Sequence, residues 1–236
     1  MATRILFIRH GETPWNRVKR FQGHLDIPLA ESGVIQARRL AERLARKANS
    51  AHAAKAMHVE QGRMTLEAIY SSDLQRAQET ARPTATALGL PLALREGLRE
   101  RHYGVFQGHD NSELAARFPE EFKVWETRRP DFAPEGGESS RAFSQRVLDT
   151  VASIVAAHPG GYVACVTHGG VLDCVYRHAR GLALDAPRDY PLFNASINTV
   201  DFDEELRASV VAWADVEHLQ GESDDDTLAH RGAASR

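Results

Sequence analysis

The sequence predicts an α/β fold, a three-layer sandwich in which helices cover both faces of a mostly parallel central sheet. Short apolar runs such as residues 3–9 and 162–168 are typical of buried strands. Between them lie longer segments, such as 140–157, whose apolar residues recur every three or four positions, as in amphipathic helices. Strands that alternate with helices in this way form parallel sheets covered on both sides.

The first half of the chain contains three short apolar runs and two helical patterns. Its predicted strands are 3–9, 66–70 and 91–94. Ser32 opens the first helix, and Gly89 ends the second. Between the first helix and the second strand, residues 46–65 are rich in Ala, Lys, His and Gln and have weak periodicity, so we interpret them as a surface insertion. The basic residues of the first helix are expected on its outer, solvated face; they are Arg38, Arg39, Arg43 and Arg46.

The second half ends in a pattern that differs from the first. Its predicted helical segments are 112–128, 140–157 and 171–180, and its predicted strands are 162–168, 196–202 and 208–213. Pro119 interrupts the first of these helices. Only the short charged turn at 203–205 separates the last two strands, which indicates an antiparallel edge to the sheet.

Composition excludes several classes of protein. The 236 residues, 42% hydrophobic and 26% charged, suit a globular domain with a sizeable core. We expect one domain over 1–218 and a polar, flexible tail over 219–236. The formal charge of −3 argues against general nucleic-acid binding. The chain has two cysteines, no signal-peptide pattern and no apolar run that could span a membrane, so we expect a cytoplasmic protein with free thiols and no membrane partner.

Two predicted strands each end at a histidine beside glycine. The first is followed by Arg9-His10-Gly11, and the strand at 162–168 ends in His168-Gly169-Gly170. One such histidine alone is typical of a structural residue at a strand end. Because ligands of parallel sheets bind beyond the carboxyl ends of the strands, the pair indicates one site built from both strands.

The residues near these two strand ends suit a phosphate group. Arg9 and Arg76, the latter in the first turns of a helix, offer planar forks of donors that match phosphate oxygens. Gly169 allows close backbone approach at a helix N-terminus, which favours an anion, and Asn16 adds a neutral donor. No Gly-x4-Gly-Lys-Ser/Thr motif occurs, so the pocket is not that of a P-loop protein.

A neutral histidine in a phosphate pocket is a candidate nucleophile. We therefore expect His10 to form a phosphohistidine, which splits one difficult transfer into two easier steps. The leaving alcohol then needs a proton, and Glu100 is the best candidate acid because a nearby phosphate dianion favours the protonated carboxyl. Glu100 is also consistent with a surface carboxylate paired to a neighbouring arginine.

Four motifs together resemble those of the histidine phosphatase superfamily, which includes the cofactor-dependent phosphoglycerate mutases. They are Arg9-His10-Gly11-Glu12-Thr13 with Asn16, the segment 71–80 around Arg76, Leu98-Arg99-Glu100-Arg101-His102-Tyr103-Gly104, and Val166-Thr167-His168-Gly169-Gly170. They occur in the family's order and span about residues 3–203. The resemblance implies the phosphoglycerate mutase-like fold.

The same resemblance assigns roles to individual residues. It implies that His10 is the phosphorylated nucleophile and Glu100 the proton donor. It implies that Arg9, Asn16, Arg76, His168 and the Gly169 amide hold the phosphoryl group, and that Gln22 and Gly23 lie in the loop that lines the substrate entrance. The family uses no metal, so none is expected. A small phosphorylated metabolite is the expected partner.

Whether the chain is a phosphatase or a mutase depends on which branch of the family it belongs to. The Glu100–Gly104 motif is shared with the mutases, in which 2,3-bisphosphoglycerate primes the reaction. Against a mutase, 109–111 lack the expected substrate-binding lysine, and 134–139 resemble the Gly-Glu-Ser loop of the phosphatase branch. We therefore favour a phosphatase without a cofactor. Arg128 and Arg129 are consistent with a second anion site or with a solvated helix end.

Other readings of the chain are less well supported. A binding or scaffold protein that keeps the fold without the chemistry is disfavoured, because every catalytic residue type is in place. A zinc site at His10 and His168 lacks a convincing third ligand. The sequence contains no Gly-x-Ser-x-Gly motif, so it does not indicate a serine hydrolase. The sequence indicates neither the natural substrate nor the oligomeric state.

Overall fold

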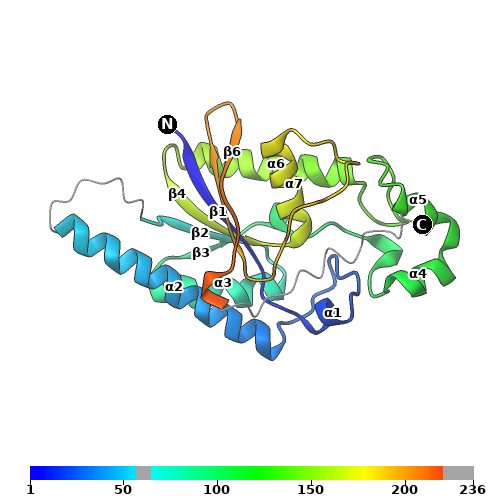
Figure 1. Cartoon of the computed structure of the whole chain (residues 1–236), viewed down its shortest axis with the longest axis horizontal. Coiled ribbons are helices and arrows are strands. Elements are labelled where there is room, and N and C mark those ends of the chain that lie inside the picture. Colours follow the sequence, from blue (N-terminus) through cyan, green and yellow to red (C-terminus); the bar gives the residue numbers. More distant parts are fainter. Residues whose placement is uncertain (57–64, 220–236) are drawn as a thin grey trace.

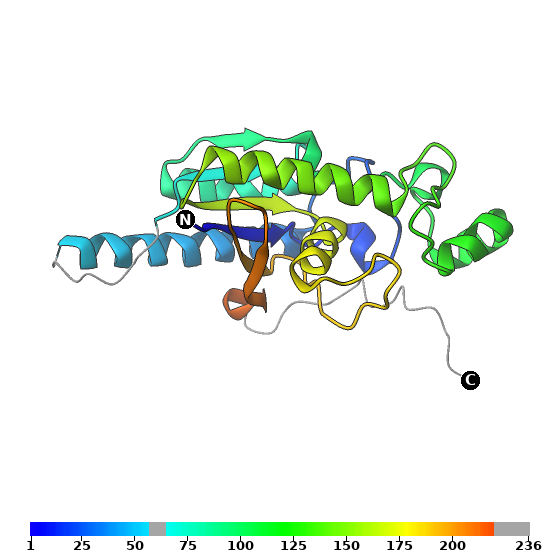
Figure 2. The same cartoon turned by 90° about the horizontal axis from the view of Figure 1, so that it is seen from above.

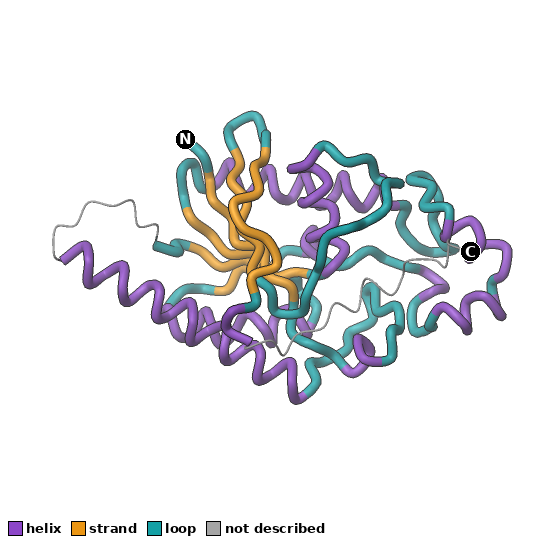
Figure 3. The backbone as a smooth tube through the Cα atoms, viewed as in Figure 1, coloured by secondary structure: helices purple, strands orange, loops and turns teal. Residues whose placement is uncertain are grey.

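The computed structural model describes residues 1–56 and 65–219, and in this part of the chain six strands form one mixed sheet. Their order is β3-β2-β4-β1-β5-β6 (Figures 1 and 3). The strands are β1 (Thr3–Arg9), β2 (Ala68–Ser71), β3 (Leu92–Leu94), β4 (Tyr162–Thr167), β5 (Ile197–Phe202) and β6 (Ala208–Asp215). The first four are mutually parallel, and β5 and β6 add the expected antiparallel edge.

Helices cover both faces of this sheet, so the predicted α/β sandwich is confirmed (Figure 2). The main helices are α2 (Glu31–Ala56), α3 (Gln75–Leu88), α6 (Ser140–Ala157) and α7 (Gly169–Arg180). Three shorter ones are α1 (Pro14–Arg17), α4 (Asn111–Arg117) and α5 (Pro119–Glu126), and 3₁₀ turns occur at η1 (Glu96–Leu98), η2 (Gly104–Phe106) and η3 (Glu217–Leu219). Pro119 starts α5, because proline suits the first turn of a helix.

The alternation of side chains along β1 explains the two cores. Ile5 and Phe7 pack with α6 and α7, whereas Leu6 and Ile8 pack with α2 and α3. Successive residues of a strand point to opposite faces, so an unbroken apolar run is what a strand buried on both faces requires.

The register of β1 and β4 places the two candidate strand ends side by side. Arg9 lies opposite Thr167, and the His10 amide donates to the Thr167 carbonyl oxygen at 2.8 Å. His10 and His168 therefore directly follow adjacent parallel strands, at the carboxyl-terminal end of the sheet.

The insertion expected at 46–65 and the tail expected at 219–236 lie only partly within the described residues. The insertion expected at 46–65 begins as a continuation of α2, which runs to Ala56 beyond the sheet at the left of Figure 1, and residues 57–64 lie outside the described part. Of the tail expected at 219–236, only Leu219 is described, and its side chain is fully buried. Residues 220–236 are likewise outside the described part. No helix of the described residues is long and apolar enough to span a membrane.

Arg43 does not lie on a solvated face, so that prediction was wrong. Its side chain is only 8% exposed and forms ion pairs with Asp215 at 2.7 Å and Glu217 at 2.8 Å. The guanidinium also lies 3.2 Å from Nδ1 of His218. These contacts attach the end of β6 and η3 to α2.

Candidate active site

A cavity of about 290 Å³ lies beyond the carboxyl ends of β1 and β4. Eight of the nine residues predicted for the site line it: Arg9, His10, Asn16, Gln22, Gly23, Arg76, Glu100 and Gly169. The ninth, His168, lies directly behind His10, with 5.2 Å between the ring centroids. The structure thus brings all nine residues to one place.

The geometry of His10 leaves one ring nitrogen able to act as a nucleophile. Its Nδ1 lies 2.7 Å from the Gly11 carbonyl oxygen. Because a carbonyl can only accept, Nδ1 carries the proton and Nε2 keeps its lone pair. Burial, and then the charges of Arg76 and Arg9, hold the pKa of His10 well below its usual range. The imidazole is therefore neutral at pH 7.

Two buried arginines flank this histidine. Arg76 is fully buried; it donates to the carbonyl oxygens of Leu25 at 2.9 Å and Gly23 at 2.7 Å, and its Nε has no hydrogen-bond partner among the described residues. Burial lowers its pKa to about 10, so it stays charged at neutral pH. Arg9 donates to the Leu192 carbonyl oxygen. Each guanidinium is thereby fixed in direction before any ligand binds.

His168 is a buried polar group in need of a partner. It is fully buried, and neither ring nitrogen has a hydrogen-bond partner in the described part of the chain. Burial, and then Arg76 and His10, hold its pKa well below the usual range. Leaving a buried polar group unpaired costs about 1–3 kcal/mol, a cost that a bound phosphate oxygen removes.

Asn16 is oriented by a capping box at the start of α1. The backbone amide of Thr13 donates to Asn16 Oδ1 at 2.8 Å, and the Thr13 hydroxyl accepts from the backbone amide of Asn16 at 3.2 Å. Because Oδ1 is used in this way, the carboxamide nitrogen is the group that can donate. Asn16 is one of the residues that line the cavity.

Glu100 sits against the N-terminus of α7. Its Oε1 accepts from the Arg101 amide at 2.8 Å, and its Oε2 accepts from the Gly170 amide at 3.0 Å. A Cβ at Gly170 would lie 2.1 Å from Oε1, so a larger residue there would displace the Glu100 carboxylate. The carboxylate is thus held at the cavity wall rather than paired with an arginine.

The comparisons with known proteins agree with this arrangement. The sequence model of the histidine phosphatase superfamily (branch 1) matches residues 5–216. The chain belongs to this superfamily. It is 35% identical to phosphoglycerate mutase-like protein 4 of Arabidopsis thaliana over 218 residues, which cover 92% of this chain and 86% of that protein.

Other relatives include phosphatases and solved structures. A metal-independent phosphoserine phosphatase of Arabidopsis thaliana is 35% identical over 220 residues, covering 92% of this chain and 84% of the relative. The structure of Bacillus stearothermophilus YhfR superposes with a TM-score of 0.76 at 34% identity and covers 92% of this chain and 99% of its own. As a member of this superfamily with relatives named as mutase-like proteins and phosphatases, the chain is an enzyme, either a phosphatase or a mutase.

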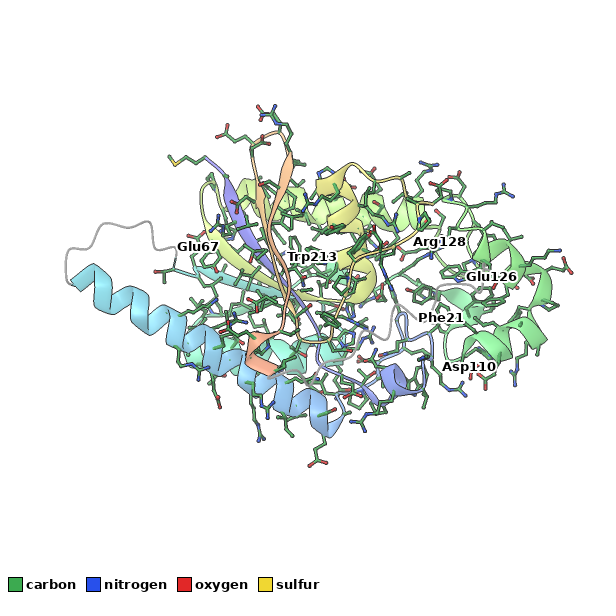
Figure 4. All side chains as sticks on the ribbon, viewed as in Figure 1. Phe21, Glu67, Asp110, Glu126, Arg128 and Trp213 are labelled. Carbon is green, nitrogen blue, oxygen red and sulfur yellow. The ribbon has the colours of Figure 1, made fainter. Side chains whose placement is uncertain are left out.

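The cavity also has an aromatic wall. Trp125 of α5 forms part of it, and the Arg101 guanidinium lies 4.6 Å from its ring centroid. Other aromatic residues of the wall are Phe21, Tyr103, Phe122 and Phe132. Phe21 lies beside α5 in Figure 4. Spacing could not show this, because the wall joins three separate segments.

Further charged residues line the outer part of the cavity. Arg128 and Arg129 follow α5, and Asp173 and Arg177 lie one turn apart on α7. Arg128 has a positive φ of 57° and donates to the Ala186 carbonyl oxygen at 3.3 Å. Among the described residues, no group of three His, Cys, Asp or Glu side chains is placed to hold a metal ion.

Proposed function

We propose that the protein is a phosphomonoester hydrolase that acts on a small phosphorylated metabolite through a phosphohistidine at His10. The observation that carries this proposal is the neutral His10, whose tautomer is fixed by the Gly11 carbonyl. It lies beside two buried arginines and His168, which has no hydrogen-bond partner among the described residues. These groups are complementary to a phosphate dianion, and Nε2 is the nucleophile.

The proposed reaction has two steps. In the first, the P–N bond to His10 Nε2 forms, the ester P–O bond breaks, and Glu100 gives its proton to the leaving alcohol. In the second, Glu100 takes a proton from water, the water oxygen bonds to phosphorus, and the P–N bond breaks. Arg9, Arg76, Asn16, His168 and the Gly169 amide stabilise the charge on the phosphoryl oxygens in both steps.

A mutase that interconverts 2- and 3-phosphoglycerate is the second candidate. The observation that favours it is the position of Arg128 and Arg129 at the outer part of the cavity, where a second anionic group of the substrate would lie. The absence of a lysine from 109–111 and the Gly-Glu-Ser loop at 134–139 favour the phosphatase. We propose that a phosphatase needs no cofactor here, whereas a mutase would need 2,3-bisphosphoglycerate as primer.

A paired assay in EDTA tests the proposal. One arm offers a panel of phosphomonoesters and measures free phosphate. The other offers 3-phosphoglycerate primed with 2,3-bisphosphoglycerate and measures 2-phosphoglycerate. Phosphate release with negligible isomer supports the phosphatase, and efficient isomer formation supports the mutase. No turnover in either arm would favour a scaffold protein, and turnover that is lost only in EDTA would contradict the metal-free mechanism.

A further inference from the structure

We infer that the Glu138–Arg146 ion pair is a positioning device that holds Glu100 in place for proton transfer. The inference rests on the proposed function, because it holds that these two residues position Glu100, the proposed general acid. Neither residue lines the cavity, so neither contacts the substrate. Their contacts converge instead on the backbone that carries Glu100.

Arg146, on α6, binds three backbone carbonyl groups of the segment that carries Glu100. Its guanidinium donates to the carbonyl oxygens of Gly97 at 3.0 Å, Arg99 at 3.2 Å and Glu100 itself at 3.2 Å. Three carbonyls on one rigid fork fix both the position and the direction of the segment.

Glu138 completes the device from the other side. Its carboxylate accepts from Arg146 Nε at 2.8 Å and Nη2 at 2.7 Å, and also from the His102 amide at 2.9 Å. Its backbone carbonyl accepts from Arg101 Nε at 2.8 Å. Burial alone would raise the pKa of Glu138, but the bonds from Arg146 and His102 lower it, so the carboxyl is ionised at neutral pH.

The entrance loop adds a second contact to the Glu100 carbonyl oxygen, beside that of Arg146. His24 Nε2 lies 2.8 Å from the Glu100 carbonyl oxygen and therefore donates to it. The backbone of Glu100 is thus held by α6, by the 134–139 loop and by the entrance loop. Its carboxylate is separately held by the amides of Arg101 and Gly170.

The side chains of Arg146 and Glu138 are only 26% and 23% exposed, so breaking the pair is expected to lower stability as well. A displacement of about 1 Å at a reacting group can in addition cost on the order of 100-fold in rate. Loosening the pair should therefore also slow proton transfer in the protein that remains folded.

The experiment compares Arg146→Lys and Glu138→Gln with wild type on two esters, an alkyl phosphate and nitrophenyl phosphate. The alkyl leaving group needs the proton from Glu100, whereas nitrophenolate leaves without it. We expect release of the leaving group in a single turnover to slow roughly 10- to 100-fold for the alkyl ester and less than about 3-fold for the nitrophenyl ester, since the second step is common to both. Arg141→Lys is the matched control, because Arg141 lies on the same helix and pairs with the exposed Asp131 at 2.6 Å.

A double variant makes the test specific. In a Glu100→Gln background, Arg146→Lys should cause no further loss on the alkyl ester, since the residue that it positions no longer donates a proton. Additive losses, or equal losses on both esters, would overturn the inference in favour of a purely structural role. Glu138→Gln, which keeps the side-chain shape, gives the same readout if Arg146→Lys does not fold.

The single Glu100→Gln variant separates this inference from the proposed function. If Glu100→Gln itself shows no preference between the two esters, the general-acid assignment fails. If it shows the preference and both ion-pair variants do not, only the positioning role fails.

Discussion

Burial and two guanidinium groups set the protonation state of the nucleophile. Desolvation is the first cause of the lowered pKa of His10, and the charges of Arg76 and Arg9 come next. A phosphate dianion favours the protonated imidazole, so its binding opposes both effects. The two arginines therefore do two things at once: they bind the dianion, and they keep the His10 lone pair available while it is bound.

Glu100→Gln tests the residue at the other end of the reaction. Glutamine keeps the hydrogen-bond acceptor for the Gly170 amide but has no acidic proton. We expect the rate of the first step, in which the leaving group departs, to fall roughly 100- to 10,000-fold for alkyl phosphates and less than about 10-fold for nitrophenyl phosphate. Single-turnover measurements of leaving-group release from the two ester types test this, with Glu42→Gln on the exposed side of α2 as a control. Equal losses in this step on both esters would show that Glu100 does not donate the proton.

At the scale of elements, the start of α2 supports the loop that carries the nucleophile. The Glu12 carbonyl oxygen accepts from the Ala30 amide at 2.9 Å, and the Glu12 amide donates to Gln36 Oε1 at 2.8 Å. Gly33 makes this approach possible, because a Cβ there would lie 2.1 Å from the Glu12 carbonyl oxygen. The helix and the loop therefore meet backbone to backbone.

Gly33→Ala should separate the two elements. Since the clash is with backbone rather than with a flexible side chain, we expect a loss of about 1–3 kcal/mol in the free energy of unfolding, together with a lower kcat. Urea denaturation and turnover measure the two effects. Val34→Ala removes atoms from a neighbouring side chain that is 38% exposed and should change neither. A Gly33→Ala protein with wild-type stability and kcat would contradict this role of the glycine.

Local sequence predicted the elements and the site far better than it predicted contacts between distant side chains. The nine residues predicted for the site meet at one cavity, and strand ends, helix starts and the family's motifs mark them in the sequence. Arg43 was misplaced because its partner Asp215 lies 172 residues further along the chain, where β6 ends. The role of Trp125 was missed for the same reason: only the folded arrangement brings α5 to the cavity.

At the scale of the whole molecule, the C-terminal segment is attached by a cluster that includes a buried histidine. Burial, and then the charge of Arg43, lower the pKa of His218 to about 4. His10 and His168 have pKa values shifted in the same direction.

These histidines predict a loss of stability in mild acid. In the unfolded chain they take up protons near pH 6.5, whereas in the folded chain they do so only at lower pH. The free energy of unfolding should therefore fall as the pH drops from about 6.5 to 4. Urea denaturation at several pH values measures this slope, and His218→Gln should make it shallower. An unchanged slope in that variant would mean that His218 does not contribute.

The most direct test of the account is to trap the phosphohistidine. Wild-type protein is mixed with nitrophenyl phosphate, quenched within milliseconds under alkaline conditions that preserve phosphohistidine, and analysed by peptide mass spectrometry, with His10→Ala as the control. We expect phosphate on the peptide that contains His10, and neither label nor turnover in the variant. An active wild-type preparation that never carries the label, or a variant that turns over at the wild-type rate, would contradict the covalent mechanism.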